Sequence, residues 1–451
     1  MKLVGTGRCS AALAVALAIL SIPALAAANG RYPAAGQIAL DPADPSIILV
    51  RATYGILLTR NAGQRWEWIC EAAVGSNGSE DPMMSFTADG SILAGVFEGL
   101  SVSHDTGCGW SFAQGGLANR YVIDLSVERS NPAQGVLIIS NSAGQNDAGD
   151  PTFLTQLWET GDNAKTWAQA GVNLPSDLLG LTVDTAPSDR NRVYVSGRLG
   201  PPSYPGVLER SDDRGKTWQK MVIPGSDDTH LPYIGAIDPS HPDVVYVRLD
   251  GDPTDQLVVT TDGGKTWVPA FTTKGNMYGL ALSPDGATIA LGGDKDGLWT
   301  APSSTLQFTK ASPVGARCLT WTGAGLYACA DEFIDKFTAG LSTDQGKTFT
   351  PLMHLQQLCG PLACGASSPV TAQCPTLWPM TATNLGAVSC DGVGAGGSGS
   401  TSGSGGGVYK GAGSCSYALP GAGLVSLASS ALLGLAAWVG RRRVHRRARR
   451  S

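Results

Sequence analysis

Charged side chains are scarce in this chain. They make up 15% of its 451 residues, and the chain has five histidines. The sequence contains no His-x-x-x-His pair and no Gly-x-Ser-x-Gly turn, so it lacks the zinc-binding helix of common metalloproteases and the nucleophile elbow of α/β-hydrolases. Four histidines are scattered through the body of the chain, at His104, His230, His241 and His354. Few segments show helical periodicity, and 59 glycines and 27 prolines favour short strands joined by turns.

The N-terminus has the pattern of a secretory signal peptide. Lys2 and Arg8 supply a short positive region, residues 11–20 are apolar, and Ala24-Leu25-Ala26 is a small-x-small cleavage pattern. The apolar stretch is too short to span a bilayer. We therefore expect residues 1–28 to be a signal peptide and the mature protein to be exported.

The C-terminus carries a second targeting pattern. Residues 392–412 form a linker of mostly glycine and serine, and residues 417–440 contain no charged side chain over the length of one transmembrane helix. Seven arginines follow between positions 441 and 450, as expected for an end that stays in the cytoplasm. Cys415 lies in a short motif of small residues. The whole segment 413–451 resembles the MYXO-CTERM sorting domain of myxobacterial surface proteins.

That resemblance implies that a membrane sorting protease cuts near Cys415 and that the helix is lost. Cys415 would then attach the mature protein, through a lipid, to the cell surface or outer membrane of a Gram-negative, myxobacterial-type bacterium. A plain C-terminal membrane anchor with an incidental cysteine is the alternative. In both cases the body of the protein faces outward.

The two targeting segments hide the charge of the body. The whole chain has 32 basic and 37 acidic residues, but nine of the basic residues lie in those two segments, which contain no acidic residue. The body therefore has 23 basic and 37 acidic residues, a net charge of about −14. An acidic body gives no electrostatic basis for binding nucleic acid.

One eight-residue pattern, Ser/Thr-x-Asp-x-Gly-x-Thr-Trp, occurs six times between the two ends. In a tight hairpin the Asp accepts hydrogen bonds from its own turn, the Gly tolerates positive φ, and the Trp anchors the hairpin. The third position holds Asn61, Asp105, Asp162, Asp213, Asp262 and Asp344, and the eighth holds Trp66, Trp110, Trp167, Trp218, Trp267 and Phe349. This pattern resembles the Asp-box, or BNR, repeat of sialidases, sortilin-type receptors and many secreted propellers, and the resemblance implies that these residues are structural.

The repeat spacing predicts the number of units. Each box follows a turn and an apolar strand, so a unit of about 40–50 residues holds about four strands, which is typical of a β-propeller blade. The gap of 82 residues between Trp267 and Phe349 leaves room for a further unit, whose box is eroded before Phe308. We predict an all-β fold: a seven-bladed β-propeller in residues 29–352, with six blades as the fallback if the eroded unit is an insertion.

Eight cysteines remain in the body of the exported chain, an even number that favours disulfides. A hairpin turning at residues 322–325 places Cys318 opposite Cys329 and pairs them. Cys70 and Cys108 lie near the box ends of adjacent units, so they could bridge blades one and two. The other four follow the last blade, in residues 353–391, and predict a small loop-rich cap of open connectivity: Cys359, Cys364, Cys374 and Cys390.

The boxes do not indicate an enzyme, because in the Asp-box family they lie on the outer rim of the blades, away from the catalytic face. The chain has no Arg-Ile-Pro motif, which argues against a sialidase. Xyloglucanase-like glycoside hydrolases use two separated carboxylates, but they generally have two propellers and this chain has room for one. The candidate carboxylates are Asp124, Asp184, Asp238 and Glu332, and we expect Asp184 and Asp238 to form the turn that recurs between strands.

The sequence therefore favours a non-enzymatic, surface-displayed propeller that binds an extracellular protein or glycan. A glycoside hydrolase acting on polysaccharide is the alternative. Tyr204 and Tyr233 are candidates for stacking on a sugar ring, although packing beneath a proline-rich loop is their simpler role. Asp250, Asp252 and Asp255 alternate as in a calcium loop but lack its closing glutamate, which favours a solvated loop and no cofactor.

Overall fold

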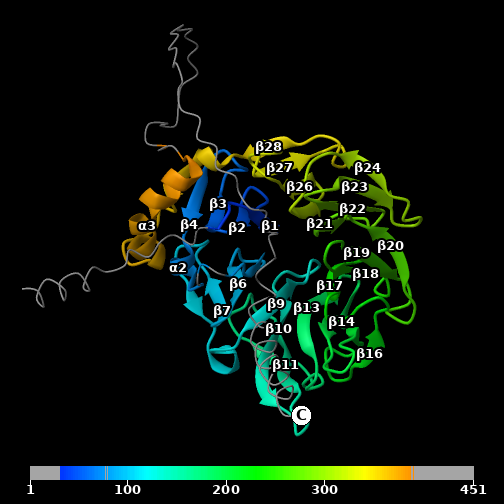
Figure 1. Cartoon of the computed structure of the whole chain (residues 1–451). Coiled ribbons are helices and arrows are strands. Elements are labelled where there is room, and N and C mark those ends of the chain that lie inside the picture. Colours follow the sequence, from blue (N-terminus) through cyan, green and yellow to red (C-terminus); the bar gives the residue numbers. More distant parts are fainter. Residues whose placement is uncertain (1–30, 77, 79, 388–389, 391–451) are drawn as a thin grey trace, which may run out of the picture.

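The computed structural model describes residues 31–387, except residues 77 and 79, together with residue 390. In this part of the chain the strands form seven sheets, which follow one another around a ring (Figure 1). Each sheet contains four strands that are consecutive in the sequence, and each of these strands pairs antiparallel with the next. Radial repetition of four-stranded sheets defines a β-propeller. The prediction of seven blades is confirmed.

The blades are numbered in chain order, and each runs from an inner to an outer strand. Blade 1 contains β1 (Ala35–Leu40), β2 (Ile48–Ala52), β3 (Gly55–Thr59) and β4 (Trp66–Ile69), and blade 2 contains β5 (Met83–Phe86), β6 (Ile92–Val96), β7 (Gly99–Ser103) and β8 (Ser111–Phe112). Blade 3 contains β9 (Val122–Val127), β10 (Gly135–Gln145), β11 (Pro151–Thr160) and β12 (Ala168–Gln169), and blade 4 contains β13 (Leu179–Ala186), β14 (Asp189–Arg198), β15 (Gly206–Ser211) and β16 (Gln219–Val222).

The remaining three blades have the same order. Blade 5 contains β17 (Leu231–Ile237), β18 (Val245–Asp250), β19 (Gln256–Thr260) and β20 (Val268–Thr272), and blade 6 contains β21 (Met277–Leu282), β22 (Thr288–Gly293), β23 (Gly297–Pro302) and β24 (Thr309–Ser312). Blade 7 contains β25 (Cys318–Thr322), β26 (Gly325–Cys329), β27 (Ala339–Ser342) and β28 (Thr350–Met353). Blade 6 is the unit with the eroded box, and Phe308 still packs in its aromatic cluster, 5.0 Å from Phe271 between ring centroids.

Neighbouring blades pack face to face, and this packing forms the core. Val136 and Ile138 of blade 3, for example, share a cluster with Val193 and Val195 of blade 4, and all four are essentially inaccessible to solvent. Because both faces of a blade are covered, the middle strands have nearly continuous apolar runs. Every residue of β6 is buried, which is the pattern expected of a strand covered on both sides.

Side chains of the inner strands also tie one blade to the next. The Gln37 amide donates to the Met84 carbonyl at 2.8 Å and accepts from its N–H at 3.1 Å, which joins blade 1 to blade 2. The Thr182 hydroxyl accepts from the Ile234 N–H at 2.9 Å between blades 4 and 5. The Thr320 hydroxyl donates to the Ile38 carbonyl at 2.8 Å, so the last blade bonds directly to the first.

The antiparallel order gives the propeller two distinct faces. The turns between first and second strands and the box turns between third and fourth strands lie on one side of the ring, which we call the box face. The turns between second and third strands and the connections from blade to blade lie on the opposite side, which we call the loop face. A short helix, α2 (Glu71–Val74), and a 3₁₀ turn, η1 (Gly115–Leu117), belong to connections on the loop face.

The segment after blade 7 covers the outer edge of blade 1. It contains η2 (Leu355–Gln357), β29 (Leu358–Pro361) and α3 (Pro369–Leu385), and we call residues 354–387 the closing segment. Strand β29 adds to β4 in parallel, which makes blade 1 a five-stranded sheet and covers its exposed edge. Helix α3 lies outside β4 and beside α2 (Figure 1).

The loop-rich cap predicted for residues 353–391 is therefore wrong for its described part, which is mainly a strand and a 17-residue helix. The sequence hid the helix because it contains Pro375 and Pro379, which remove two backbone donors. Its end signals are nevertheless present. Ser368 caps the N-terminus by accepting from the Thr371 N–H at 3.0 Å, and Gly386 ends the helix with a φ of 65°.

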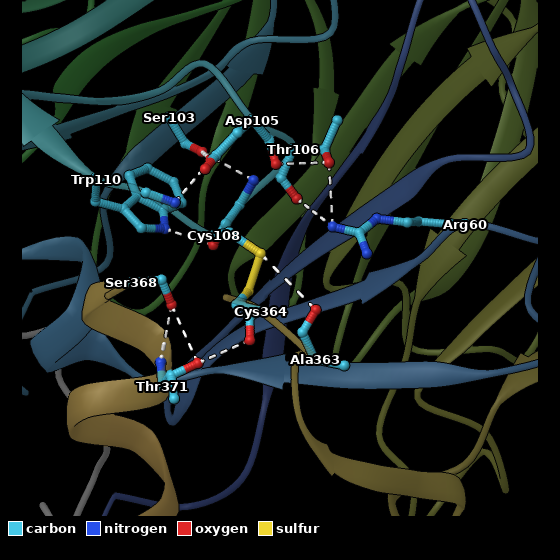
Figure 2. Close-up of a disulfide and its surroundings, with 12 residues drawn as sticks. Arg60, Ser103, Asp105, Thr106, Cys108, Trp110, Ala363, Cys364, Ser368 and Thr371 are labelled. Carbon is cyan, nitrogen blue, oxygen red and sulfur yellow. Dashed lines mark hydrogen bonds between the residues drawn. A yellow bond between two sulfur atoms is a disulfide. The ribbon is translucent and has the colours of Figure 1, made fainter. Parts of the chain in front are cut away.

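The eight described cysteines form four disulfides. Cys318 pairs with Cys329 across the β25–β26 hairpin, as the register predicts. The suggested Cys70–Cys108 bridge is wrong, because both cysteines bind the closing segment instead. The pairs are Cys70–Cys374, Cys108–Cys364 and Cys359–Cys390. Figure 2 shows Cys108, at the end of the second box, joined to Cys364.

The signal peptide at residues 1–28, the linker at 392–412 and the sorting segment with Cys415 lie outside the described residues. Among the helices that the structure does describe, none is long and apolar enough to cross a membrane.

Candidate functional site

The Asp boxes are turns closed by their own side chains. In the fifth box, Asp262 Oδ1 accepts from the Thr260 hydroxyl and from the Thr266 N–H, both at 2.8 Å, while Oδ2 accepts from the Thr266 hydroxyl at 2.7 Å. The Thr266 N–H, followed by its hydroxyl, lowers the pKa of Asp262 to about 2. The Gly264 N–H donates back to the Thr260 hydroxyl at 2.8 Å.

The other boxes repeat this geometry. The carboxylate or amide oxygen bonds the hydroxyl two residues before it and the N–H four residues after it in five further boxes, those of Asn61, Asp105, Asp162, Asp213 and Asp344. The side chains at the eighth position pack between blades: Trp66, Trp110, Trp167, Trp218, Trp267 and Phe349. On the box face, these acidic side chains are engaged within their own hairpins.

The four carboxylates proposed from the sequence do not come together. Asp238 lies on the box face and caps its own turn, accepting from the Ser240 and His241 N–H groups. Glu332 lies on the loop face of blade 7, where it accepts from the Thr338 hydroxyl and bonds the His354 ring at 2.9 Å. Only Asp124 and Asp184 are neighbours.

Asp124 and Asp184 lie on the inner strands of blades 3 and 4. Asp124 Oδ2 accepts from the Val183 N–H at 2.8 Å, and Asp184 Oδ1 accepts from the Ser126 hydroxyl at 2.7 Å. Burial raises the pKa of both, and the charge of Asp184 raises that of Asp124 further. The expectation that Asp184 forms a turn is wrong, because it lies within β13. Both carboxylates bond the adjoining blade, so they join inner strands.

The loop face contains a pocket between blade 1 and the connection to blade 2. Glu80 is 6% exposed, and its Oε2 accepts from the Phe97 N–H at 2.9 Å. Arg51 donates to the Asp81 carbonyl at 2.6 Å, and burial lowers the pKa of Arg51. Glu71 comes from the first turn of α2. The lining consists of Arg51, Ala52, Gly55, Ile56, Glu71, Val74, Ser76, Glu80 and Pro82.

The walls of this pocket are held by contacts remote in sequence. Gly55 has a φ of 119°, and a Cβ there would lie 2.5 Å from the Ile69 carbonyl oxygen, so the turn into β3 requires glycine. Cys70, the residue before α2, is tied to Cys374 of the closing segment. Sequence reasoning missed the pocket because neither glutamate belongs to a repeated motif. The glycine after Tyr54 is the local signal that a tight approach occurs there.

Aromatic side chains surround the same region of the loop face. The Phe97 and Tyr121 rings meet edge to face with centroids 4.5 Å apart. Burial, followed by the charges of Glu80 and Tyr233, raises the pKa of Tyr121 to about 12. Glu80 follows blade 1, Tyr121 precedes blade 3 and Tyr233 belongs to blade 5, yet the charges of Glu80 and Tyr233 both act on Tyr121. Tyr233 also stacks beneath Arg248, whose guanidinium carbon is 5.0 Å from the ring centroid.

The other sequence candidates on the loop face have structural partners. Tyr204 packs under the Arg198 guanidinium at 4.7 Å. Asp255 is fully buried and accepts from the Gly251 N–H at 2.9 Å and the Met277 N–H at 2.7 Å. In the part of the chain that the structure describes, no group of three or more His, Cys, Asp or Glu residues is placed to hold a metal ion. Calcium binding by Asp250, Asp252 and Asp255 stays a prediction.

Comparison with known sequences gives a limited match. No protein-family model matches the chain. A xyloglucanase from Paenibacillus sp. is 29% identical over a region that covers 34% of this chain and 18% of that protein. The chain therefore matches less than a fifth of the length of this curated relative.

Comparison with solved structures supports the fold. An ancestral GH74 enzyme matches with a TM-score of 0.52 and 14% identity, covering 70% of this chain and 46% of that structure. The GH74 enzyme of Niastella koreensis matches with a TM-score of 0.45 and 12% identity, covering 71% and 53%. The protein is a seven-bladed β-propeller that resembles the propellers of GH74 xyloglucanase-like enzymes. Its four disulfides indicate an extracellular or secreted protein.

Proposed function

We propose that the protein is a glycoside hydrolase that acts on an extracellular polysaccharide at its loop face. The observation that carries this proposal is the pocket that holds Glu71, Glu80 and the partly buried Arg51. The pocket is small, with room for about one water molecule, so it would admit a water or one substituent of a sugar at its mouth while the polysaccharide lies across it. The similarity to a xyloglucanase favours hydrolysis over the binding-only function that the sequence favoured.

The chemistry requires two carboxyl groups with different tasks. One donates a proton to the glycosidic oxygen, and the other activates water or attacks the anomeric carbon. Glu80 is fixed in orientation because its Oε2 accepts from the Phe97 N–H. Glu71 is carried by α2, which the Cys70–Cys374 disulfide fixes to the closing segment. Tyr121, whose pKa is raised by burial and by the charge of Glu80, provides aromatic surface near Glu80 for a sugar ring.

The test is release of reducing ends from neutral polysaccharides, with xyloglucan as the first substrate. Glu71→Gln and Glu80→Gln are expected to abolish release while leaving the fold intact. Glu98→Gln is the matched control, since Glu98 lies in the adjacent β6–β7 turn of the same face and does not line the pocket. Full activity in both pocket variants would exclude this pair as the catalytic site.

A second candidate function is binding of polysaccharide without cleavage. It is favoured by the burial of Glu80, which is 6% exposed and offers little surface to a reacting sugar. In that case xyloglucan or another neutral polysaccharide should bind the wild-type protein and the two Gln variants equally. No oligosaccharide should be released over a long incubation.

We also propose that the propeller is displayed at the cell surface through its C-terminal segment, with Cys415 as the attachment residue. The support is the sequence pattern of linker, cysteine, apolar stretch and arginines. Cys415→Ala should prevent the shift in mature mass and the surface retention that this proposal expects of the wild type. Unchanged mass and unchanged fractionation would favour a plain membrane anchor.

A further inference from the structure

Three exposed apolar side chains gather on the loop face of blade 7. Phe333 is 55% exposed, Ile334 75% and Tyr32 44%. Phe333 and Ile334 lie in the turn between β26 and β27, whereas Tyr32 precedes β1, and the Tyr32 and Phe333 rings meet edge to face with centroids 5.8 Å apart. We call these three residues the apolar knob. Exposed large apolar residues that cluster in this way mark interaction sites.

A buried charged residue holds the knob in one conformation. Asp331 is 6% exposed, and its Oδ1 accepts from the Phe333 N–H at 2.9 Å and the Ile334 N–H at 3.2 Å. The same carboxylate accepts from the Tyr32 hydroxyl at 3.1 Å and from Arg317 at 2.7 Å.

Two further contacts, which do not involve Asp331, also fix the side chains and backbone of the knob. The Arg317 guanidinium carbon lies 5.6 Å from the centroid of the Tyr32 ring. The Lys336 ammonium donates to the Phe333 carbonyl at 2.7 Å. A preorganised apolar surface loses little conformational entropy when a ligand covers it.

The knob is connected to the pocket through two consecutive residues. Tyr32 bonds Asp331 of blade 7, and Arg31 makes a 2.6 Å ion pair with Asp81 in the connection that follows the pocket residue Glu80. The Asp81 carbonyl in turn accepts from Arg51 of the pocket. An extended ligand that passes the pocket on the side of blade 1 can therefore reach the knob.

The chemistry of this surface fits a neutral sugar chain. The knob presents aromatic and aliphatic carbon, which suits the C–H faces of a pyranose ring with equatorial hydroxyls, as in β-linked glucans. The body of the protein has a net charge of about −14, so polyanionic chains would be repelled.

We propose that the apolar knob is an outlying subsite that holds a neutral, β-linked polysaccharide chain beyond the pocket. This inference rests on the proposed function, since it assumes that the polysaccharide crosses the loop face. The subsite increases the affinity for long chains and takes no part in bond cleavage. Short oligosaccharides that cover only the mouth of the pocket do not reach it.

The test compares Phe333→Ala and Ile334→Ser with Val268→Ser, using xyloglucan polymer and its short oligosaccharides as probes. Val268 is 58% exposed on the outer strand of blade 5, so its change removes a similar exposed apolar group elsewhere. Each knob variant is expected to weaken binding of the polymer about five- to tenfold, from the loss of one aromatic or aliphatic contact with a sugar ring. KM for the polymer should rise by the same factor while kcat, oligosaccharide binding and the Val268→Ser protein stay unchanged.

The outcomes separate this inference from the proposed function. Unchanged polymer affinity in both knob variants, with activity lost in Glu80→Gln, overturns the subsite and leaves the hydrolase. Weaker binding in the knob variants with full activity in Glu71→Gln and Glu80→Gln supports the subsite and overturns that catalytic assignment. Reversible self-association that Ile334→Ser abolishes would make the knob a contact between protein molecules and overturn the subsite. A wild-type protein that neither binds nor cleaves polysaccharide overturns both.

Discussion

The repeated hairpin boxes and the loop-face pocket use acidic side chains in different ways. On the box face, Asp262 bonds only residues within four positions of itself, and the same bonds recur in other boxes. On the loop face, Glu80 contacts Phe97, and its charge acts on Tyr121. The box side chains thus stabilise their own hairpins, whereas the irregular loop face brings together groups from different blades, which is the property a site needs.

The largest expected effect is on kcat/KM, which should depend on the loop face and not on the box face. Glu80→Gln should lower kcat/KM for polysaccharide at least about a hundredfold, the usual contribution of a general acid or base. Asp262→Asn on the box face should leave kcat/KM within about twofold. Initial rates and thermal unfolding of both variants check this comparison, which fails if the box-face change reduces the rate as much as the pocket change.

The next effect concerns the disulfides that hold the loop-face pocket. Removing Cys70–Cys374 by a Cys70→Ala, Cys374→Ala double change should lower the free energy of unfolding by about 2–4 kcal/mol. This bridge spans 304 residues, whereas Cys318–Cys329 spans 11. Because a longer closed loop restricts the unfolded chain more, removing the Cys318–Cys329 bridge should lower the free energy of unfolding by less. Denaturant titration of the two double variants measures both losses, and equal losses would count against closure by the C-terminal segment.

A smaller effect on stability is expected when one box on the box face is disrupted. Asp262→Ala removes the acceptor for the Thr266 N–H and should lower the free energy of unfolding by about 1 kcal/mol, as loss of a cap does. Because the pKa of Asp262 is lowered to about 2, its contribution is present above the unfolded-state pKa of about 4 and is lost as pH falls toward 2. Wild type and variant should therefore converge in stability near pH 2. A constant difference across this range would contradict the assignment.

The smallest effect lies between the two faces, on the inner strands. Burial and Asp184 raise the pKa of Asp124 in the folded protein, so the native state holds a proton that the unfolded state loses above about pH 4. Stability therefore falls as pH rises through this window. Asp124→Asn keeps an acceptor for the Val183 N–H but cannot ionise, so the stability of this variant should fall less as pH rises. Midpoints of thermal unfolding between about pH 4 and 8 would show the change, and an unaltered slope would count against it.

The sequence by itself determined the features that depend on short separations. Seven units follow from the box spacing, including the eroded one before Phe308, because a blade folds from four consecutive strands. The Cys318–Cys329 pair follows from the register of one hairpin. Ser368 and Gly386 also mark the ends of α3, although Pro375 and Pro379 within it oppose a helical interpretation.

Only the tertiary structure decided the partners that lie far apart in the chain. Cys70 and Cys108 bond Cys374 and Cys364 because the closing segment returns along blade 1, at separations of 304 and 256 residues. Glu80 and Tyr233 act on Tyr121 together because a ring of blades brings the ends of its inner strands to one opening. Local pattern specifies each blade, but contacts between blades depend on the radius and closure of the whole ring. Such contacts form the apolar knob and hold the walls of the pocket in place.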